Sequence, residues 1–122
     1  MKKVLVVDDA DVIRSQVSRA LSPAGFTILE AVDGAAGLSA ARANADLSLI
    51  VLDVNMPIMG GIEMLERLKE DPRTAAIPVL LLTTEGQESL ILRAKKAGAK
   101  GWMVKPVKPE MLLKAVQALA RG

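Results

Sequence analysis

The sequence predicts an α/β protein in which a five-stranded parallel sheet is covered by helices on both faces. Five short apolar runs alternate with five segments of helical periodicity. The apolar runs are continuous rather than alternating, which is typical of strands buried on both faces. The chain has 122 residues, of which 51% are hydrophobic, so it can bury a substantial core. We therefore expect one domain over residues 1–122.

The first half of the chain contains three expected strands and two helices between them. The apolar runs that we assign to strands are KVLVV (3–7), FTILEA (26–31) and LSLIVL (47–52). Residues 11–22 are predicted to be helical because one helical face carries their apolar side chains, namely Val12, Ile13, Val17, Ala20 and Leu21. Pro23 and Gly25 end this segment, and an alanine-rich helix over 35–43 follows a turn at Asp33 and Gly34.

The second half continues the alternation after a loop, NMPIMGG (55–61), that is rich in proline and glycine. Helical spacing in 62–70 rests on Ile62, Leu65 and Leu68. IPVLLL (77–82) and GWMV (101–104) are predicted strands, and a helix over 87–97 stops at Gly98. Pro109 suits a first helical turn, and it opens a last helix whose apolar residues are Met111, Leu112, Ala115, Val116 and Leu119.

Two missing residue types exclude several kinds of chemistry. The chain has no cysteine, which excludes disulfides, zinc–thiolate sites and thiol nucleophiles. It has no histidine, which excludes a Ser–His triad, imidazole metal ligands and a phosphohistidine carrier. Apolar runs are also far shorter than the roughly 18 residues needed to cross a bilayer. Any chemistry must therefore use carboxylates, hydroxyls, lysines and backbone groups, and we expect a cytoplasmic protein without membrane contact.

The net charge of +2 hides an uneven distribution. Residues 93–122 contain eight basic side chains and one acid, Glu110, whereas the remainder holds eight basic and thirteen acidic side chains. Such a segment can be an ordinary solvated face, a docking surface for an acidic protein or a nucleic-acid site. Its basic residues are interleaved with helix-forming apolar residues, and Trp102 is its one aromatic. We therefore favour the solvated face and expect no nucleic-acid partner.

Acidic residues follow two of the predicted strands. Asp8 and Asp9 follow the 3–7 strand, and Asp53 follows the 47–52 strand. Ligands of open parallel sheets bind outside the carboxyl ends of the strands, where the connection order reverses. If these two strands are neighbours, three carboxylates meet there, and two unit charges ~4 Å apart repel by ~4 kcal/mol at an effective dielectric of 20. Such a cluster needs a raised pKa, a cation or both.

Two further residues can complete a phosphoryl-transfer site. Lys105 follows the 101–104 strand and can bring its ammonium to the same edge, where Thr83 contributes a hydroxyl. An oxygen-only ligand set suits a hard cation, and one or two carboxylates with waters is the usual way to hold Mg²⁺. An aspartate beside Mg²⁺ and a lysine is arranged to attack phosphorus and form an acyl phosphate.

Each of these residues also has a simpler explanation when it is taken alone. We interpret Asp11 as the N-cap of the 11–22 helix, and Thr84 can cap the following helix. Asp8 alone can be a cap, Lys105 alone a solvated charge and Thr83 alone part of a strand. Acids after two strands, a hydroxyl after a third and a lysine after a fourth are much harder to obtain by chance. The joint set therefore favours a functional site.

The sequence resembles the receiver domain of bacterial two-component response regulators over essentially its whole length. The matching motifs come in order: the pair Asp8-Asp9, LDVNMP around Asp53, LTT ending at Thr83-Thr84, and Lys105-Pro106. The spacing matches as well, with 30 residues from Asp53 to Thr83 and 22 from Thr83 to Lys105. The resemblance implies a flavodoxin-like (βα)5 fold, a strand order of 2-1-3-4-5 and no output domain.

The resemblance also implies a role for each matching residue. Asp53 accepts a phosphoryl group from a histidine kinase, so the chain is a signalling phosphoacceptor that catalyses only its own phosphorylation and dephosphorylation. Asp9, Asp53 and the carbonyl of Asn55 bind Mg²⁺ directly, and Asp8 acts mainly through a coordinated water. Lys105 pairs with the phosphoryl oxygens, and a cis peptide bond precedes Pro106.

The switch that the resemblance implies begins at Thr83, which swings toward the phosphoryl group and vacates space for the aromatic residue at position 102. The signal is then read on the surface formed by the 87–97 helix, the 101–104 strand and the last helix. Trp102 departs from the tyrosine or phenylalanine usual there, so its inward movement needs a roomier cavity. Gly60 and Val107 replace a common aspartate and a frequent phenylalanine, away from the chemistry.

Single-domain chemotaxis regulators are the members that the sequence resembles most. Asn55 lies two residues after Asp53 and Glu85 two after Thr83, as in those regulators. The resemblance implies that both residues flank the path of an attacking water and favour a short-lived phosphoryl group. The implied partners are a histidine kinase, a downstream target such as a flagellar-switch protein, and a phosphatase. We expect a monomer, with a weak dimer through the signalling surface as the alternative. A phosphorelay shuttle or a cell-cycle receiver is the alternative role.

Two other classes of protein fit less well. A phosphatase with an aspartyl nucleophile usually carries a second aspartate two residues after the nucleophile, where this chain has Asn55. A flavodoxin-like flavin binder needs a phosphate loop rich in hydroxyls or glycine after the first strand. The sequence DDAD at residues 8–11 repels a phosphate unless a metal intervenes.

Overall fold

The structure is a computed structural model that describes residues 2–56, 59–84 and 86–121. Its centre is a parallel sheet with the strand order β2-β1-β3-β4-β5, which confirms the predicted α/β class and strand order. The strands are β1 (Lys3–Val7), β2 (Thr27–Ala31), β3 (Leu49–Asp53), β4 (Val79–Thr83) and β5 (Gly101–Val104). Strands β1 and β5 agree with the predicted ones at both ends, and the other three agree to within two residues.

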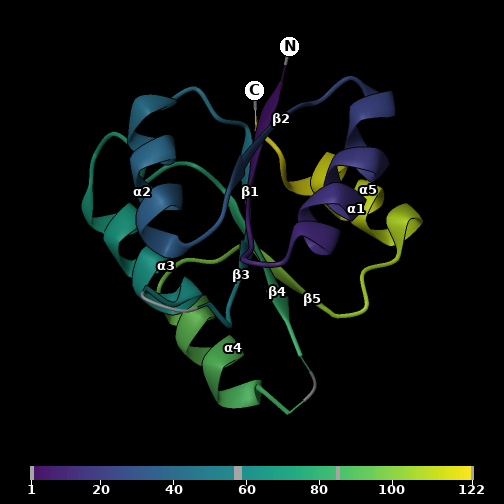
Figure 1. Ribbon diagram of the computed structural model, residues 1–122. Coiled ribbons are helices and arrows are strands. Elements are labelled where there is room, and N and C mark those ends of the chain that lie inside the picture. The colour runs from purple at the N-terminus through teal and green to yellow at the C-terminus, as the bar shows by residue number, and fades with distance from the viewer. Residues whose placement is uncertain (1, 57–58, 85, 122) are drawn as a thin grey trace.

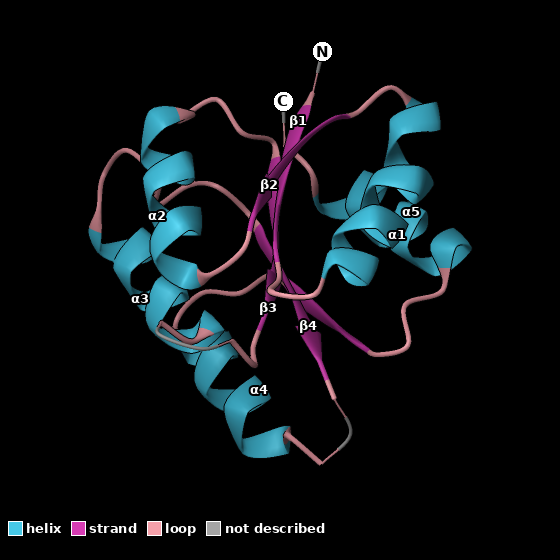
Figure 2. Cartoon of the chain, in the orientation of Figure 1, coloured by secondary structure: helices cyan, strands magenta, loops and turns pink. Residues whose placement is uncertain are grey.

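Helices cover both faces of this sheet, as Figures 1 and 2 show. They are α1 (Asp11–Leu21), α2 (Gly34–Ala43), α3 (Gly61–Glu70), α4 (Glu88–Lys96) and α5 (Pro109–Leu119), and a short 3₁₀ turn (Ser22–Ala24) follows α1. Helices α1 and α5 lie on one face of the sheet, and α2, α3 and α4 lie on the other. The described part of the chain contains no helix that is both long and apolar enough to span a bilayer.

The sheet separates two apolar cores. One core packs Leu5, Leu52 and Leu81 against α2 and α3, and the other packs Val6 and Val51 against α1 and α5. Alternate residues of each central strand thus face opposite cores, which explains why these strands are apolar throughout their length.

Two apolar residues assigned to buried helical faces are exposed. Val12 lies in the first turn of α1 and is 64% exposed, and Met111 lies in the first turn of α5 and is 58% exposed. The buried residues of α1 are Arg14, Val17 and Leu21 instead, spaced three and four positions apart. The prediction for these two residues was wrong because each helix turns the next residue in the chain, Ile13 or Leu112, toward the core instead.

The N-cap of α1 is Ala10, so the prediction that Asp11 caps this helix was wrong. Asp11 is the first helical residue, and its carboxylate pairs with the Arg14 guanidinium one turn later. An acid at this position still interacts favourably with the positive end of the helix dipole. The side chain of Asp8 accepts the backbone N–H of Ala10 at 2.9 Å, so it fixes the loop that leads into α1.

Two glycines are required by the local geometry. A Cβ on Gly61 would lie 2.2 Å from the carbonyl oxygen of Asp53, so only glycine lets α3 start this close to the end of β3. Gly98 has φ +103 and ends the turn after α4, as the sequence predicted. The start of α3 is therefore packed directly against the end of the strand that carries Asp53.

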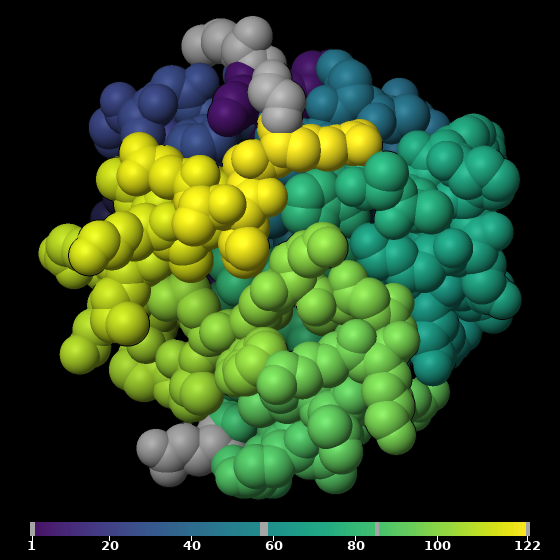
Figure 3. Space-filling model, turned by 180° about the vertical axis from the view of Figure 1, so that it is seen from behind, coloured from purple at the N-terminus to yellow at the C-terminus, as the bar shows by residue number. Residues whose placement is uncertain are grey.

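The edge of the sheet at β5 is much less buried than its centre. All five residues of β3 and of β4 are buried, whereas Trp102 and Val104 of β5 are exposed. Within the described chain, α4 buries Ala94 alone. Figure 3 shows α4, β5 and α5 side by side, in green to yellow, on one face of the molecule.

Candidate functional site

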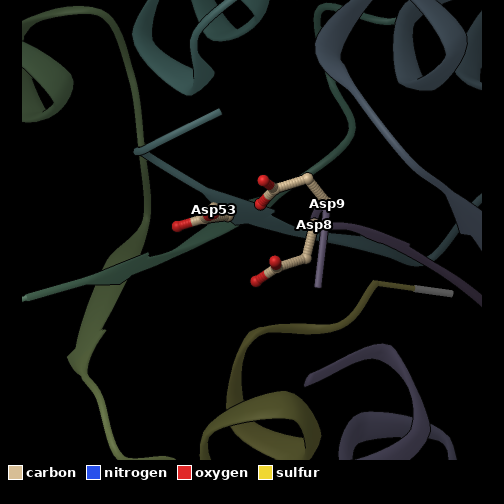
Figure 4. Close-up of side chains that lie close together, drawn as sticks. All are labelled: Asp8, Asp9 and Asp53. Atoms are coloured by element: carbon tan, nitrogen blue, oxygen red, sulfur yellow. The ribbon is translucent and has the colours of Figure 1, made fainter. Parts of the chain in front are cut away.

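Three carboxylates meet at the carboxyl end of the sheet. Asp8 and Asp9 lie directly after β1, and Asp53 is the last residue of the neighbouring strand β3. One carboxylate oxygen of each residue lies within 4.8 Å of the others, and Figure 4 shows the three side chains gathered at one place. Asp8 and Asp53 are buried, whereas Asp9 is exposed. The predicted convergence of these acids is confirmed, and it follows from the pairing of Val7 with Leu52 in adjacent strands.

Lys105 supplies the positive charge that this cluster requires. Its ammonium lies 3.2 Å from Asp8 Oδ2 and 3.2 Å from Asp53 Oδ1, so a single cation joins both buried carboxylates. The Lys105 backbone N–H donates to the Thr83 carbonyl at 2.7 Å, and the following bond to Pro106 is cis, as the resemblance implied. Burial opposes the charge on Lys105, but Asp53 and Asp8 outweigh this effect and raise its pKa.

The pKa of Asp53 is raised above its usual value. Burial is the main cause, and the negative charge of Asp8 adds to it. Lys105 and the backbone N–H of Asn55, which donates to Asp53 Oδ1 at 3.2 Å, oppose the shift without cancelling it. Without a metal ion, the site therefore holds Asp53 in an environment that disfavours its charged form, and a bound cation would relieve this effect.

The donor set fits magnesium. The clustered ligands are carboxylate oxygens, which Mg²⁺ prefers, and Asp9 is open to solvent, where waters can complete the coordination shell. The two buried acids also carry more negative charge than one lysine compensates. The residues present therefore suit a small, hard, doubly charged cation.

Thr83 lies at the end of β4 beside the acidic cluster. Asp53 pairs with Leu82 in the sheet, so the next residue of β4 borders the same edge. The Thr83 side chain is buried, and its hydroxyl donates to the carbonyl of Met103 in β5 at 3.4 Å. Thr84 is exposed and does not cap α4, because the N-cap of that helix is Gln87. The alternative of a Thr84 cap is thus wrong.

Trp102 lies away from the acids, on the exposed side of β5. Its side chain is 40% exposed, and the Lys95 ammonium of α4 lies 4.4 Å from the centre of the indole ring. This cation–π contact links α4 to β5. Glu85, to which we assigned a role beside the phosphoryl group, lies outside the described residues.

Sequence reasoning missed two residues that hold the site together. The buried side chain of Arg14 donates to the Asp8 carbonyl at 2.6 Å and to Glu30 Oε1 at 3.0 Å, so it anchors the acidic loop to β2. Its spacing from Val17 and Leu21 placed it on the buried face of α1, and this spacing was the available signal. The side chain of Gln87 bonds Asn55 and Thr84 on two separate loops, and no pattern in the sequence indicates it.

Known proteins share both the sequence pattern and the fold. The family model of the response regulator receiver domain matches residues 4–117. The chain is 35% identical over 118 residues to chemotaxis protein CheY1 of Helicobacter pylori, covering 96% of this chain and 95% of that protein. It is 33% identical to protein PilH of Pseudomonas aeruginosa over 122 residues, covering 100% of both.

A solved structure of chemotaxis protein CheY4 from Vibrio cholerae superposes with a TM-score of 0.90 at 41% sequence identity, covering 98% of each chain. Such agreement over nearly the whole length extends to the order of strands and helices, which is that of the flavodoxin-like fold. The match to the receiver model and the likeness to single-domain chemotaxis regulators agree with the acid cluster and its lysine. The chain belongs to the response regulator receiver domain family.

Proposed function

We propose that this chain is a single-domain response regulator that accepts a phosphoryl group on Asp53 from the phosphohistidine of a histidine kinase. The observation that carries the proposal is the arrangement of Lys105 between Asp8 and Asp53, next to Asp9. A structural ion pair needs one acid for one lysine. A partly buried lysine shared by two of three clustered acids is instead typical of a site that binds a further cation or an anionic group.

The chain's own residues supply the nucleophile and much of the electrostatic stabilisation. An Asp53 carboxylate oxygen attacks phosphorus, the bond from phosphorus to the donor imidazole nitrogen breaks, and its electron pair leaves with the imidazole. Lys105, already 3.2 Å from Asp53 Oδ1, offsets the charge on the transferring oxygens. Asp9, Asp53 and the Asn55 carbonyl would hold Mg²⁺ directly, with Asp8 acting through water. Bound Mg²⁺ would neutralise charge on the phosphoryl oxygens.

Signal output is assigned to the face formed by α4, β5 and α5. The three elements of this face carry the exposed apolar residues Leu92, Trp102, Val104 and Met111. A pocket of about 300 Å³ lies on the β5–α5 side of this face and is lined by Trp102, Met103, Val104, Pro106, Lys108 and Met111. Apolar side chains with lysines around them suit an acidic, partly apolar segment of a target protein. Thr83, which bonds Met103 of β5, is the residue that would link phosphorylation to this face.

A role in chemotaxis is the favoured setting, because the relatives reported above include two chemotaxis proteins that match over nearly their whole length. The proposed partners are then a histidine kinase, a flagellar-switch protein as target and a phosphatase, all in the cytoplasm. Asn55 and Glu85 are assigned to the path of the attacking water, so the phosphoryl group is short-lived. A phosphorelay shuttle is the second candidate, and a pull-down with the phosphorylated protein separates the two by the partner that it retains.

Labelling with a small phosphodonor tests the proposal. Acetyl phosphate with Mg²⁺ should add one acid-stable, alkali-labile phosphoryl group, and acetate leaves as the phosphorus–oxygen bond of the donor breaks. Asp53→Asn should abolish labelling, and removal of Mg²⁺ with a chelator should do the same. Asp46→Asn is the matched control, because Asp46 is an exposed acid paired with Lys3 away from the site. Labelling that persists in Asp53→Asn would contradict the assignment.

Trp102 provides an independent measurement of the proposed switch. It is the one tryptophan of the chain, and it lies on β5 within the proposed output face. Phosphorylation should change its fluorescence emission as its contacts with Lys95 and the solvent change. An emission spectrum that labelling leaves unchanged would show that Trp102 does not take part.

A further inference from the structure

One side chain connects the two loops that flank Asp53. The Gln87 carboxamide donates from Nε2 to Asn55 Oδ1 at 2.8 Å and accepts at Oε1 from Asn55 Nδ2 at 3.3 Å. The same Oε1 accepts the backbone N–H of Thr84 at 2.7 Å. Two hydrogen bonds thus join the loop after β3 to Gln87 in the loop after β4, and the third, from Thr84, holds the Gln87 side chain within its own loop. We call this arrangement of Gln87, Asn55 and Thr84 the Gln87 clasp.

Both loops begin at the phosphoacceptor site. Asn55 is two residues beyond Asp53, and its backbone N–H donates to Asp53 Oδ1 at 3.2 Å. Thr84 directly follows Thr83, at the end of the strand in which Leu82 pairs with Asp53. The clasp therefore occupies the Asn55 side-chain amide and the Thr84 N–H at the edge of the sheet where Asp53 lies.

We propose that Gln87 is a positioning residue that keeps these two loops in the unphosphorylated arrangement and releases them when Asp53 is phosphorylated. This inference rests on the proposed function of Asp53. A phosphoryl group on Asp53 adds strongly charged acceptor oxygens next to donors that the clasp now satisfies. Hydrogen bonds to an oxyanion are roughly twice as strong as those between neutral groups, so the new acceptors compete successfully with the neutral Gln87 amide.

Because Gln87 lies at the start of α4, release of the clasp would affect that helix. Gln87 is the N-cap residue of α4, so a shift of its side chain acts directly on the start of that helix. Ala94 is the buried residue of α4, and little apolar packing therefore opposes its movement. The clasp thus connects the state of Asp53 to the position of α4, by a route that does not use Thr83 or Trp102.

Substitution of Gln87 should make phosphorylation easier, because it destabilises the unphosphorylated arrangement. We expect Gln87→Met and Gln87→Ala to lower the concentration of acetyl phosphate that half-saturates labelling by roughly threefold to tenfold, as expected from the loss of a few exposed hydrogen bonds. Met keeps the size of the side chain, so equal effects of both variants identify hydrogen bonding as the cause. Gln117→Ala, an exposed glutamine on α5, is the matched control and should leave the value unchanged.

Amide hydrogen exchange at Thr84 tests the clasp without any phosphodonor. Its N–H should exchange several-fold faster in Gln87→Met than in the unmodified protein, because its acceptor is lost. Unchanged exchange and unchanged half-saturation in Gln87→Met, with normal labelling of the unmodified protein, would overturn the inference. If the unmodified protein is not labelled at all, the proposed function fails instead, and the exchange rate of Thr84 still decides whether the clasp exists.

Discussion

The centre of the sheet and its β5 edge are built in different ways. Strands β3 and β4 bury every residue, and they carry Asp53 and Thr83 at their ends. Strand β5 exposes Trp102 and Val104, and the neighbouring helix α4 buries Ala94. Both regions belong to one sheet, but only the central one is packed from both sides along its whole length.

In the proposed function, this difference places phosphoryl transfer in the rigid centre of the sheet and the conformational response at its β5 edge. In that function, Asp8 and Asp53 hold a cation and a phosphoryl group in a fixed geometry, and the close-packed strands β1 and β3 would provide that rigidity. A region with few buried apolar contacts can change its arrangement at low free-energy cost. The proposed output face lies in such a region, next to the residues that sense phosphorylation.

The largest expected difference in stability is between the alanine variants of two leucines, one from each region. Leu81 of β4 is fully buried, whereas Leu92 of α4 is 56% exposed. Leu81→Ala should lower the free energy of unfolding by about 2–5 kcal/mol through lost burial and a cavity. Leu92→Ala should change it by less than about 0.5 kcal/mol. Urea denaturation followed by circular dichroism measures both, and equal losses would show that α4 is as firmly packed as β4.

A methyl group on Gly61 should be the next most disruptive change. Its Cβ would lie 2.2 Å from the Asp53 carbonyl oxygen, so the backbone at the phosphoacceptor has to move. We expect Gly61→Ala to lower the free energy of unfolding by about 1–3 kcal/mol and to slow labelling of Asp53. Gly60→Ala is the neighbouring control, because its Cβ would meet Val54 O at an ordinary 3.7 Å. Equal melting temperatures and equal labelling rates for the two variants would contradict this expectation.

Neutralising Asp53 should stabilise the metal-free protein at neutral pH. The pKa of Asp53 is raised in the folded state, so its charged form costs folding free energy above the folded pKa. This cost disappears as the pH falls below the unfolded pKa of about 3.9. Asp53→Asn should therefore raise the free energy of unfolding at pH 7, and the gain should vanish near pH 3.

Added Mg²⁺ should make the unmodified protein more stable than Asp53→Asn, the reverse of the order expected without metal. A ligand that binds only the folded state stabilises it, so the unmodified protein should gain more from Mg²⁺ than Asp53→Asn, which has lost one carboxylate of the cluster. Denaturation curves in chelator and in Mg²⁺ provide both comparisons. If Asp53→Asn is less stable than the unmodified protein in chelator at pH 7, the pair with Lys105 outweighs the cost of burial and the expectation is wrong.

The smallest effect is expected at the contact between α4 and β5. The Lys95 ammonium lies 4.4 Å from the centre of the Trp102 ring, and the tryptophan is 40% exposed. Lys95→Gln should lower the free energy of unfolding by about 0.5 kcal/mol and shift the emission of Trp102. Lys114→Gln, at an exposed position on α5, is the control and should leave the emission unchanged. An unaltered spectrum in Lys95→Gln would mean that α4 is held by other contacts.

Sequence patterns predicted the fold and the meeting of the acids because both follow from simple geometry. Continuous apolar runs indicate strands buried on both faces, and the carboxyl ends of parallel strands meet at one edge. Asp8 and Asp53 were therefore placed together although 45 residues separate them. The family resemblance added the strand order and the cis bond before Pro106, which residue patterns alone do not provide.

The predictions from sequence were wrong or incomplete where burial, capping or contacts depend on the three-dimensional arrangement of the chain. Val12 and Met111 are apolar residues of correctly predicted helices, but Ile13 and Leu112, next to them in the chain, face the core instead. Asp11 has the residue type of an N-cap but lies one position too late, and Ala10 takes that place. The link between Gln87 and Asn55 depends on where two loops run, and local sequence does not specify this.

The position of Lys105 late in the chain has a consequence for synthesis. Asp8 and Asp53 leave the ribosome well before the lysine that joins them, which directly follows β5. A truncated product that stops before β5 retains every acid of the cluster but lacks its counter-charge. To close its sheet, such a fragment would have to desolvate two adjacent anions, protonate one of them or bind another cation, so folding of a truncated chain is disfavoured at neutral pH.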